Sequence, residues 1–386
     1  MGPLKGFVVI ELAGIGPAPF AGMLLSDMGA TVIRIDRRDA TDIGIPGRTP
    51  KFDVLGRGRK SIAVDLKSAE AIGIVKRLVA KADVLIEGFR PGVIERLGLG
   101  PDVLSAINPK LVIGRMTGYG QEGPMADRAG HDINYISLAG ALHGIGRKGE
   151  APVPPLNLVG DFGGGGMFLA FGVVAALLEA SRSGKGQVVD AAMVDGAAYL
   201  MAMMYGFRSA GQWHDERGVN MLDTGAPWYE VYETSDGKWL ALGAIEQRFY
   251  HELLEGLGLA GADIPKQHDR KRWPELRAIF ASVIKSKSRA DWVATFEGKD
   301  ACVTPVLSLD EVASDPHMQQ RKTLQTVDGV SAPQPAPRFS RTHPTAGAAA
   351  REPGADSEQV LADFGFSATE IKDLGERGVV GQQMKR

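Results

Sequence analysis

FVVIELAGIGPAPFAGMLLSDMGATVIRID, residues 7–36, is the stretch of sequence that decides the fold. The apolar runs Phe7–Leu12 and Thr31–Asp36 have the length and the β-branched content of buried strands. Between them, the apolar segment from about Pro19 to Met28 has the length of a helix. Two strands joined by a helix predict a parallel βαβ unit, because parallel neighbours need a crossover connection.

The same alternation continues to about residue 225 and then changes. Helices are expected at about 68–81 and 101–107, between further strands at Ser61–Leu66, Val84–Glu87, Leu111–Met116 and Gln187–Ala192. A hairpin is expected over Trp228–Gly243, followed by helices near 247–257, 274–285 and 289–297. The chain is therefore predicted to be α/β, with a smaller α+β unit after it. A proline-rich linker or extended wrap and two short helices are expected after residue 325.

The composition is that of an ordinary globular protein of two domains. The chain has 386 residues, and 44 Lys and Arg nearly balance 46 Asp and Glu, so no overall field attracts nucleic acid or an anionic membrane. Cys302 is the single cysteine, which excludes an intramolecular disulfide and a cysteine-based zinc site. The longest apolar run, Gly166–Leu178, is too short to span a bilayer of roughly 30 Å and predicts a helix buried between layers. Because the N-terminus lacks the features of an export signal, we expect a cytoplasmic protein.

The first loop has part of a dinucleotide-binding fingerprint. Gly14 and Gly16 follow a strand, and Asp36 comes 20 residues after Gly16. Pro19 stands in place of the third glycine, however, and Pro17 removes an amide that would bind pyrophosphate. A nicotinamide or flavin cofactor is therefore not expected here.

Basic residues lie next to several of the expected strands. Arg37 and Arg38 follow the second strand, where α/β sheets bind ligands, and two guanidinium groups suit a phosphate. The others near the third and fourth strands are Arg57, Arg59, Lys60, Arg90 and Arg96. Each alone is more often a surface residue. Together they predict a site for a nucleotide with several phosphates at one edge of the sheet.

Three titratable side chains lie in segments otherwise made of small and apolar residues. His131 opens an expected helix after Gly130, Asp161 precedes the glycine run Gly163–Gly166, and Glu246 ends the hairpin. A carboxylate is costly to bury unless it is paired or functional, and the glycines could donate amides to a developing oxyanion. Simpler interpretations remain open: Asp161 as a helix N-cap, His131 as a hydrogen-bonded core histidine, and Glu246 as an acid at the start of the next helix.

Four segments resemble the signature segments of the α-methylacyl-CoA racemases, a branch of the family III CoA-transferases. They are Gly130–Tyr135, Pro155–Phe162, Gly184–Ala191 and Gly243–Glu246, and the similarity spans essentially residues 2–340. The resemblance implies an interlocked homodimer, threaded like chain links, with a Rossmann-like large domain built from both chain ends. The implied boundaries are 1–200 for this CoA-binding domain, 201–226 for a linker, 227–320 for a small α+β domain, and 321–386 for a linker and a C-terminal segment that returns to the large domain.

The resemblance also implies which residues meet the substrate. Arg37 would bind phosphate at the adenosine end of CoA, with Val64, Asp65, Leu66, Lys67 and Arg96 along the CoA site. Beside the thioester would run Gly130, Ile133, Asn134 and Tyr135. CoA is part of the substrate, and the resemblance implies no nicotinamide, flavin or metal.

The implied reaction interconverts (R)- and (S)-2-methylacyl-CoA through an enolate. Inversion needs one acid/base group on each face of the planar enolate, because one removes the α-proton and the other returns a proton opposite. His131 and Asp161 match this pair, Glu246 would orient the imidazole, and Asp132 is a secondary candidate. Helix N-terminal amides near Asp161 or His131 would stabilise the enolate oxygen.

Two other functions and the acyl chain remain open from the sequence. A family III CoA-transferase would use Asp161 as a nucleophile to move CoA between carboxylic acids, but it needs neither His131 nor Glu246. A CoA- or nucleotide-binding subunit without catalysis would have no use for two buried titratable groups. Fatty, bile-acid-like, sterol-derived and arylpropionyl chains would all suit an apolar surface. Methionines at 193, 201, 203 and 204 favour either such a surface or simple core filling.

Overall fold

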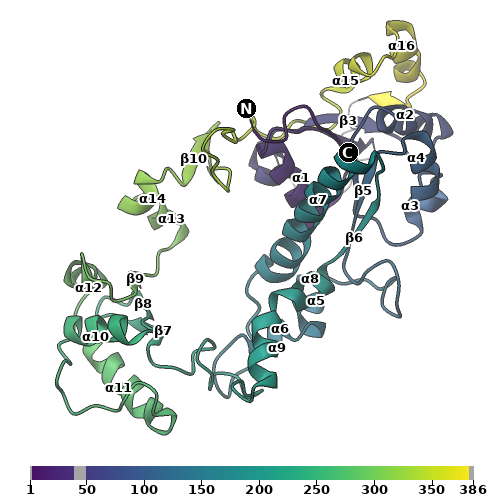
Figure 1. Ribbon diagram of the computed structural model, residues 1–386. Coiled ribbons are helices and arrows are strands. Elements are labelled where there is room, and N and C mark those ends of the chain that lie inside the picture. The colour runs from purple at the N-terminus through teal and green to yellow at the C-terminus, as the bar shows by residue number, and fades with distance from the viewer. Residues whose placement is uncertain (1, 39–48, 382–386) are drawn as a thin grey trace. The chain divides into compact units, whose positions relative to one another are not determined.

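The computed structural model describes residues 2–38 and 49–381, and the chain divides into two compact units (Figure 1). The first comprises Met1–Ala139, Leu156–Met201 and Gln320–Arg386, and the second comprises Gly140–Pro155 and Ala202–Gln319. Residues 202–226, expected to be a linker, therefore belong to the second unit, and so do residues 140–155. Residues 140–155 are held to the second unit by polar contacts. Arg147 pairs with Glu230 at 2.8 Å, and Arg217 donates to the carbonyls of His143 and Glu150.

The first unit is built on a seven-stranded sheet of order β12-β3-β2-β1-β4-β5-β6. Six strands are parallel: β1 (Val8–Leu12), β2 (Thr31–Arg37), β3 (Lys60–Val64), β4 (Val84–Glu87), β5 (Val112–Thr117) and β6 (Val188–Ala192). The short β12 (Val380–Gly381) runs antiparallel to β3. This order is that of a doubly wound nucleotide-binding sheet. Strands β2 and β3 are added on one side of β1, and β4, β5 and β6 are added on the other side, so the order of the strands reverses between β1 and β4. Ligands bind in such sheets beyond the carboxyl ends of the strands at that reversal.

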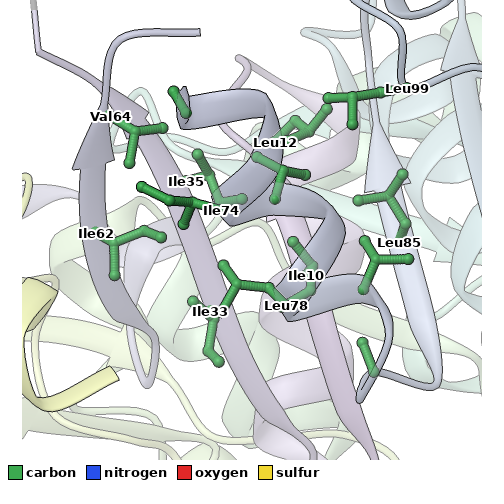
Figure 2. Packing of buried hydrophobic residues seen from close by; sticks show 14 of the residues in the cluster. Ile10, Leu12, Ile33, Ile35, Ile62, Val64, Ile74, Leu78, Leu85 and Leu99 are labelled. Atoms are coloured by element: carbon green, nitrogen blue, oxygen red, sulfur yellow. The ribbon is translucent and has the colours of Figure 1, made fainter. Parts of the chain in front are cut away.

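Alternation along the strands divides the core into two layers. Ile10, Ile33 and Ile62 point to the face covered by α2 (Ala69–Val79), where Ile74 and Leu78 pack against them (Figure 2). The neighbouring residues of the same strands point to the opposite face, covered by α1 (Pro17–Asp27) and α7 (Phe168–Ser183). Strands buried on both faces explain why their sequences are continuously apolar.

The first unit contains several further elements. They are α3 (Val93–Arg96), α4 (Pro101–Ile107), α5 (Asp132–Leu138), α8 (Met193–Leu200), α15 (Ser357–Asp363), α16 (Ala368–Glu376), the 3-10 turns Pro50–Phe52 and Val54–Gly56, and the hairpin β10 (Leu324–Val327) and β11 (Val330–Pro333). The hairpin lies in the stretch that was expected to be a linker. Helices α15 and α16 return to the sheet, because Val360, Leu361 and Phe366 join the α2 side of the core.

The second unit has a three-stranded antiparallel sheet and its own core. The strands are β7 (Tyr229–Glu233), β8 (Trp239–Gly243) and β9 (Val303–Pro305). Its helices are α6 (Ala141–Gly144), α9 (Ala202–Ser209), α10 (Gln247–Gly256), α11 (Trp273–Ile284), α12 (Arg289–Phe296) and α13 (Leu309–Val312), with α14 (Pro316–Gln320) at the boundary and a 3-10 turn at Arg270–Arg272. Trp228, Phe280 and Trp292 are fully buried at its centre. The predicted hairpin and the three predicted helices are confirmed.

The apolar helix is longer and more exposed than the sequence indicated. A π-helical segment, Leu158–Met167, runs directly into α7, and within the described residues this is the one helix long and apolar enough to cross a membrane. One side packs on the sheet so closely that a Cβ on Gly114 would lie 2.8 Å from Leu169. The other side exposes Phe171 and Leu178. In the single chain the helix is therefore buried on one side only, and not between two layers as expected.

Candidate active site

Asp161 lies inside the π-helical segment, beside the first loop of the sheet. Its carboxylate accepts a hydrogen bond from the Asn157 side-chain amide at 3.2 Å. A Cβ on Gly16 would lie 3.3 Å from Asp161 Oδ2, so the carboxylate reaches the loop that follows β1. The interpretation of Asp161 as an N-cap is wrong, since Asn157 holds the N-cap position. Asp161 thus stands where a doubly wound sheet binds ligands.

Asp132 joins α5 to the π-helical segment. Its Oδ1 accepts a hydrogen bond from the backbone amide of Asp161 at 2.6 Å, and its side chain is buried. A Cβ on Gly160 would lie 2.5 Å from the same oxygen, so glycine is needed there. The other oxygen, Oδ2, is buried and has no hydrogen-bond partner among the described residues. Asp132 therefore fixes the backbone that carries Asp161 and keeps one unused acceptor.

His131 occupies the N-cap position of α5 and is exposed. Its backbone amide donates to the side-chain oxygen of Asn134 at 3.0 Å, which fixes the start of the helix. The interpretation of His131 as a core histidine is wrong, because its side chain faces solvent in the isolated chain. Asp132, the next residue, accepts the backbone amide of Asp161, so the two predicted bases lie on adjoining elements.

Burial and charge favour a proton on Asp161. The pKa of its carboxyl is raised, first by burial and then by the negative charge of Asp132, against the hydrogen bond from Asn157 and the charge of His131. Nearby, burial raises the pKa of Tyr135 to about 12, and its hydroxyl donates to the carbonyl of Gly130. Tyr135 is therefore a neutral packing residue, and Asp161 is the group whose environment suits reversible proton transfer.

The glycine run serves close packing. A Cβ on Gly164 would lie 2.6 Å from the amide nitrogen of Ala197 in α8, and one on Gly166 would lie 2.6 Å from Phe20 in α1. These glycines also lie within the π-helix, whose amides donate to carbonyls five residues earlier. The prediction that they donate amides to an oxyanion is therefore wrong. The Asp161 amide is also engaged, by Asp132, so of the two predicted amide positions only the one at the start of α5, beside His131, stays a prediction.

Glu246 belongs to the second unit. It is exposed, holds the N-cap position of α10, and makes no side-chain hydrogen bond to that helix. Its charge raises the pKa of Cys302, after the larger effect of burial. Its carboxylate is thus available for another partner, and its predicted contact with His131 stays a prediction.

The predicted CoA-binding segment lies at the carboxyl ends of β2 and β3. Arg37 is exposed and pairs in register with Val64, so the two predicted segments are neighbours. Asp65 and Lys67 are exposed after the strand, and Leu66 is half-buried against the core. Val64 is fully buried, and its side chain belongs to the core. The segment can therefore offer Arg37 and Lys67 to a phosphate, but not the Val64 side chain.

The remaining predicted contacts lie on two other loops. Arg96 is exposed at the end of α3, which follows the turn after β4. Ile133 and Asn134 are exposed on the first turn of α5, while Gly130 is half-buried before it. A Cβ on Gly130 would lie 2.6 Å from the Tyr119 hydroxyl, so this backbone packs tightly. Among the described residues, no group of three or more His, Cys, Asp or Glu is placed to hold a metal ion.

The predicted arginine cluster is wrong for three of its members. Arg57 pairs with buried Asp27 at 2.5 Å, and Arg59 pairs with buried Glu11 at 2.6 Å. Arg38 donates to the carbonyl of Gly378 in the C-terminal segment. The physical reason is that Arg57 and Arg59 precede β3, so they lie away from the strand ends that bind ligands. The two buried acids were the missed signal, because such carboxylates need cations.

Lys60 and Arg90 are the remaining two basic residues of that prediction. Lys60 pairs with Asp363 at 3.1 Å on the surface, near the returning C-terminal helices. Arg90 is exposed in the turn after β4 and acts electrostatically on Tyr135 of α5. Only Arg90 of the two therefore lies near the candidate site. Asn157, which contacts the Asp161 carboxylate, was absent from the predicted site residues.

The sequence and the fold match a known family. The family model described as CoA-transferase family III matches residues 4–357, and the chain belongs to that family. A solved CaiB/BaiF family protein from Brucella suis aligns with a TM-score of 0.80 and 26% identity, covering 94% of this chain and 99% of that one. Two more similar relatives are the alpha-methylacyl-CoA racemases of Mus musculus and Homo sapiens. They are 47% and 44% identical, covering 96% and 98% of this chain and 96% and 97% of theirs.

Proposed function

We propose that this protein racemises 2-methylacyl-CoA thioesters. The observation that carries the proposal is the link between two predicted bases: Asp132, which follows the exposed His131, accepts the backbone amide of Asp161, and burial raises the pKa of the Asp161 carboxyl. The high identity to the two racemases over nearly the full chain supports the same activity.

In the proposed reaction, His131 and Asp161 exchange roles with the direction of turnover. Neutral His131 removes the α-proton of one enantiomer, and protonated Asp161 returns a proton to the opposite face of the enolate. For the other enantiomer, ionised Asp161 removes the proton and His131 returns one. Because burial raises the pKa of Asp161, its protonated form is more accessible than that of an ordinary aspartate, which suits a group that both donates and accepts a proton. The role of Glu246 is to orient the imidazole of His131, within one subunit or across a dimer.

The test is incubation of each pure enantiomer in deuterated water without any acceptor acid. The racemase should incorporate deuterium at the α-carbon while optical activity is lost. Absence of exchange, followed by CoA transfer once a carboxylic acid is added, would assign the protein to the transferases instead. That alternative uses Asp161 as a nucleophile and matches a relative 36% identical over 66% of this chain, the Succinyl-CoA--D-citramalate CoA-transferase of Chloroflexus aurantiacus.

We further propose that CoA lies along the carboxyl ends of β2 and β3, with Arg37 and Lys67 at its phosphates. Support comes from the exposure of both side chains at the sheet edge where such folds bind nucleotides. The proposed proton transfer needs no cofactor, since CoA is part of the substrate. We also propose a cytoplasmic location, which a single cysteine fits.

We also propose an interlocked homodimer, supported by an exposed apolar band on the π-helical segment, α7 and α8. The band consists of Leu158, Met167, Phe171, Val174, Leu178, Tyr199 and Leu200. A surface of this kind is typical of a protein interface, because water contact with so much apolar area is unfavourable. Light scattering should find dimers at all dilutions that retain activity. Phe171→Lys should prevent stable dimers, whereas Leu309→Lys, at an even more exposed apolar side chain off the band, should not. Stable active monomers of the parent protein would refute the proposal.

A further inference from the structure

Tyr135 is a buried residue whose hydroxyl has no part in the proposed proton transfer. A phenylalanine would fill the same space in the core, yet the hydroxyl of Tyr135 donates a hydrogen bond to the carbonyl of Gly130. Because burial raises the pKa of Tyr135 to about 12, the hydroxyl keeps its proton and remains a donor near neutral pH. The bond therefore runs in one direction, from Tyr135 to the peptide group that precedes His131.

That peptide group is held at both of its polar ends. The Gly130 carbonyl accepts the Tyr135 hydroxyl, and the His131 amide donates to the side-chain oxygen of Asn134 at 3.0 Å. The peptide group after His131 is fixed as well, because the His131 carbonyl accepts the Asn134 amide at 2.8 Å. With the peptide groups on both sides held, the direction in which the His131 side chain leaves the backbone is set.

The loop after β5 supports Tyr135 from the other side. The ring lies directly on Gly118, where a Cβ would lie 2.2 Å from it, and Tyr119 packs edge-to-face against it with ring centres 4.9 Å apart. A Cβ on Gly130 would lie 2.6 Å from the Tyr119 hydroxyl and 2.8 Å from the Tyr135 ring. The two rings thus pack against Gly130 and connect it to the end of β5.

These contacts reach one of the two proposed bases and not the other. Proton transfer needs the imidazole within hydrogen-bond reach of one proton on one face of the substrate, and a displacement of roughly 1 Å at a reacting group can cost about 100-fold in rate. Glu246 is proposed to orient the ring of His131, but it cannot place the Cα atom from which that ring extends. Asp161 has separate contacts, from Asn157 to its carboxylate and from Asp132 to its amide.

We propose that Tyr135, supported by Tyr119, is a positioning residue that acts through His131. The inference rests on the proposed function, because it assigns to His131 the proton transfer on one face of the enolate. Loss of the Tyr135 hydroxyl should therefore weaken the two halves of the reaction unequally. The enantiomer that gives its α-proton to His131 should react slowly, whereas the enantiomer that gives its α-proton to Asp161 should still lose it.

The test measures α-deuterium incorporation from pure (R)- and (S)-2-methyldecanoyl-CoA in deuterated water. In Tyr135→Phe, incorporation should fall about tenfold for the enantiomer whose exchange is lost in His131→Ala, and stay within about twofold for the other. The other enantiomer should also give more deuterated product of retained configuration, because its proton is returned by the base that removed it. Racemisation itself should fall equally in both directions, since a substitution cannot change the equilibrium constant, so exchange is the decisive measurement.

Tyr232→Phe is the matched control. The Tyr232 hydroxyl is buried and donates to the carbonyl of Pro227 at 2.7 Å, so this variant loses a hydrogen bond of the same kind in the core of the second unit. It should lose about as much stability in chemical denaturation as Tyr135→Phe, yet keep the parent ratio of exchange between the two enantiomers. Asn134→Ala frees the other end of the same peptide group and should give the Tyr135→Phe pattern, which serves if Tyr135→Phe does not fold.

Three results in Tyr135→Phe would overturn the inference. They are an equal fall in exchange for both enantiomers, a fall confined to the enantiomer that His131→Ala still exchanges, and unchanged exchange of both. Absence of deuterium incorporation from either enantiomer by the parent protein is a different outcome, because it refutes the proposed function and the inference with it.

Discussion

Removal of the Asn157 amide should shift the pH dependence of catalysis in a defined direction. Its hydrogen bond to the Asp161 carboxylate favours the ionised form, so Asn157→Ala should raise the pKa of Asp161. A hydrogen bond to a charged group is worth roughly 1.5–3 kcal/mol. At 3.2 Å this bond is long, so we take the lower value of about 1.5 kcal/mol, which corresponds to about one pH unit.

The assay is kcat/KM for both enantiomers over a range of pH. One enantiomer needs neutral His131 with protonated Asp161, and the other needs protonated His131 with ionised Asp161. These two forms carry the same number of protons, so both enantiomers should give the same bell-shaped profile of kcat/KM against pH. In Asn157→Ala the acid side of that bell should move up by about one unit, and the alkaline side should stay. Asn134→Ala is the matched control, because this amide contacts the His131 backbone and not Asp161. An acid side that stays in place or moves down in Asn157→Ala would refute this account of the Asp161 pKa.

Three further predictions concern other parts of the molecule. His131→Ala and Asp161→Ala should both abolish racemisation but retain slow deuterium exchange for opposite enantiomers, as measured by mass spectrometry; normal racemisation in His131→Ala would exclude a two-base mechanism. Arg37→Ala should raise KM for acyl-CoA more than it lowers kcat, and should remove most of the preference over the 3′-dephospho substrate. Arg59→Ala should destabilise the fold by about 3–5 kcal/mol in chemical denaturation, because it leaves the Glu11 carboxylate buried and unpaired; a loss below about 1 kcal/mol would contradict the importance of this pair.

Strands were predictable because their signal is local. The runs at Phe7–Leu12, Thr31–Asp36 and Val84–Glu87 became β1, β2 and β4 with boundaries within one residue, since burial on both faces requires continuous apolar sequence. The start of the apolar helix was harder to predict, because it depends on contacts between segments far apart in the sequence. Leu158–Met167 forms a π-helix whose geometry depends on packing against α1 and α8, and this tertiary contact left Asp161 inside the helix instead of at its cap.

The prediction that Arg57 and Arg59 belong to a phosphate site failed for a similar reason. Arg57 and Arg59 have the sequence context of surface residues, and only the arrangement of the sheet brings Asp27 and Glu11 to them. Those two acids lie within a helix and a strand that are otherwise apolar. A buried acid in such a position requires a cation somewhere in the fold. The sequence could therefore predict that each acid has a basic partner, but not which residue that partner is.

The candidate site depends on backbone contacts more than on its two titratable side chains. Asp161 meets the first loop because Gly16, at φ +69°, turns there without a Cβ, and because Gly164 allows α8 to approach the π-helix. Asp132 then fixes the Asp161 amide from the helix that begins at His131. The two bases are thus positioned by one continuous set of contacts between α5, the π-helix and the loop after β1. A Cβ at Gly164 would clash with the backbone of α8 and displace the segment that carries Asp161, although neither base would be substituted. The glycines beside Asp161 are therefore as important to the position of the site as the aspartate itself.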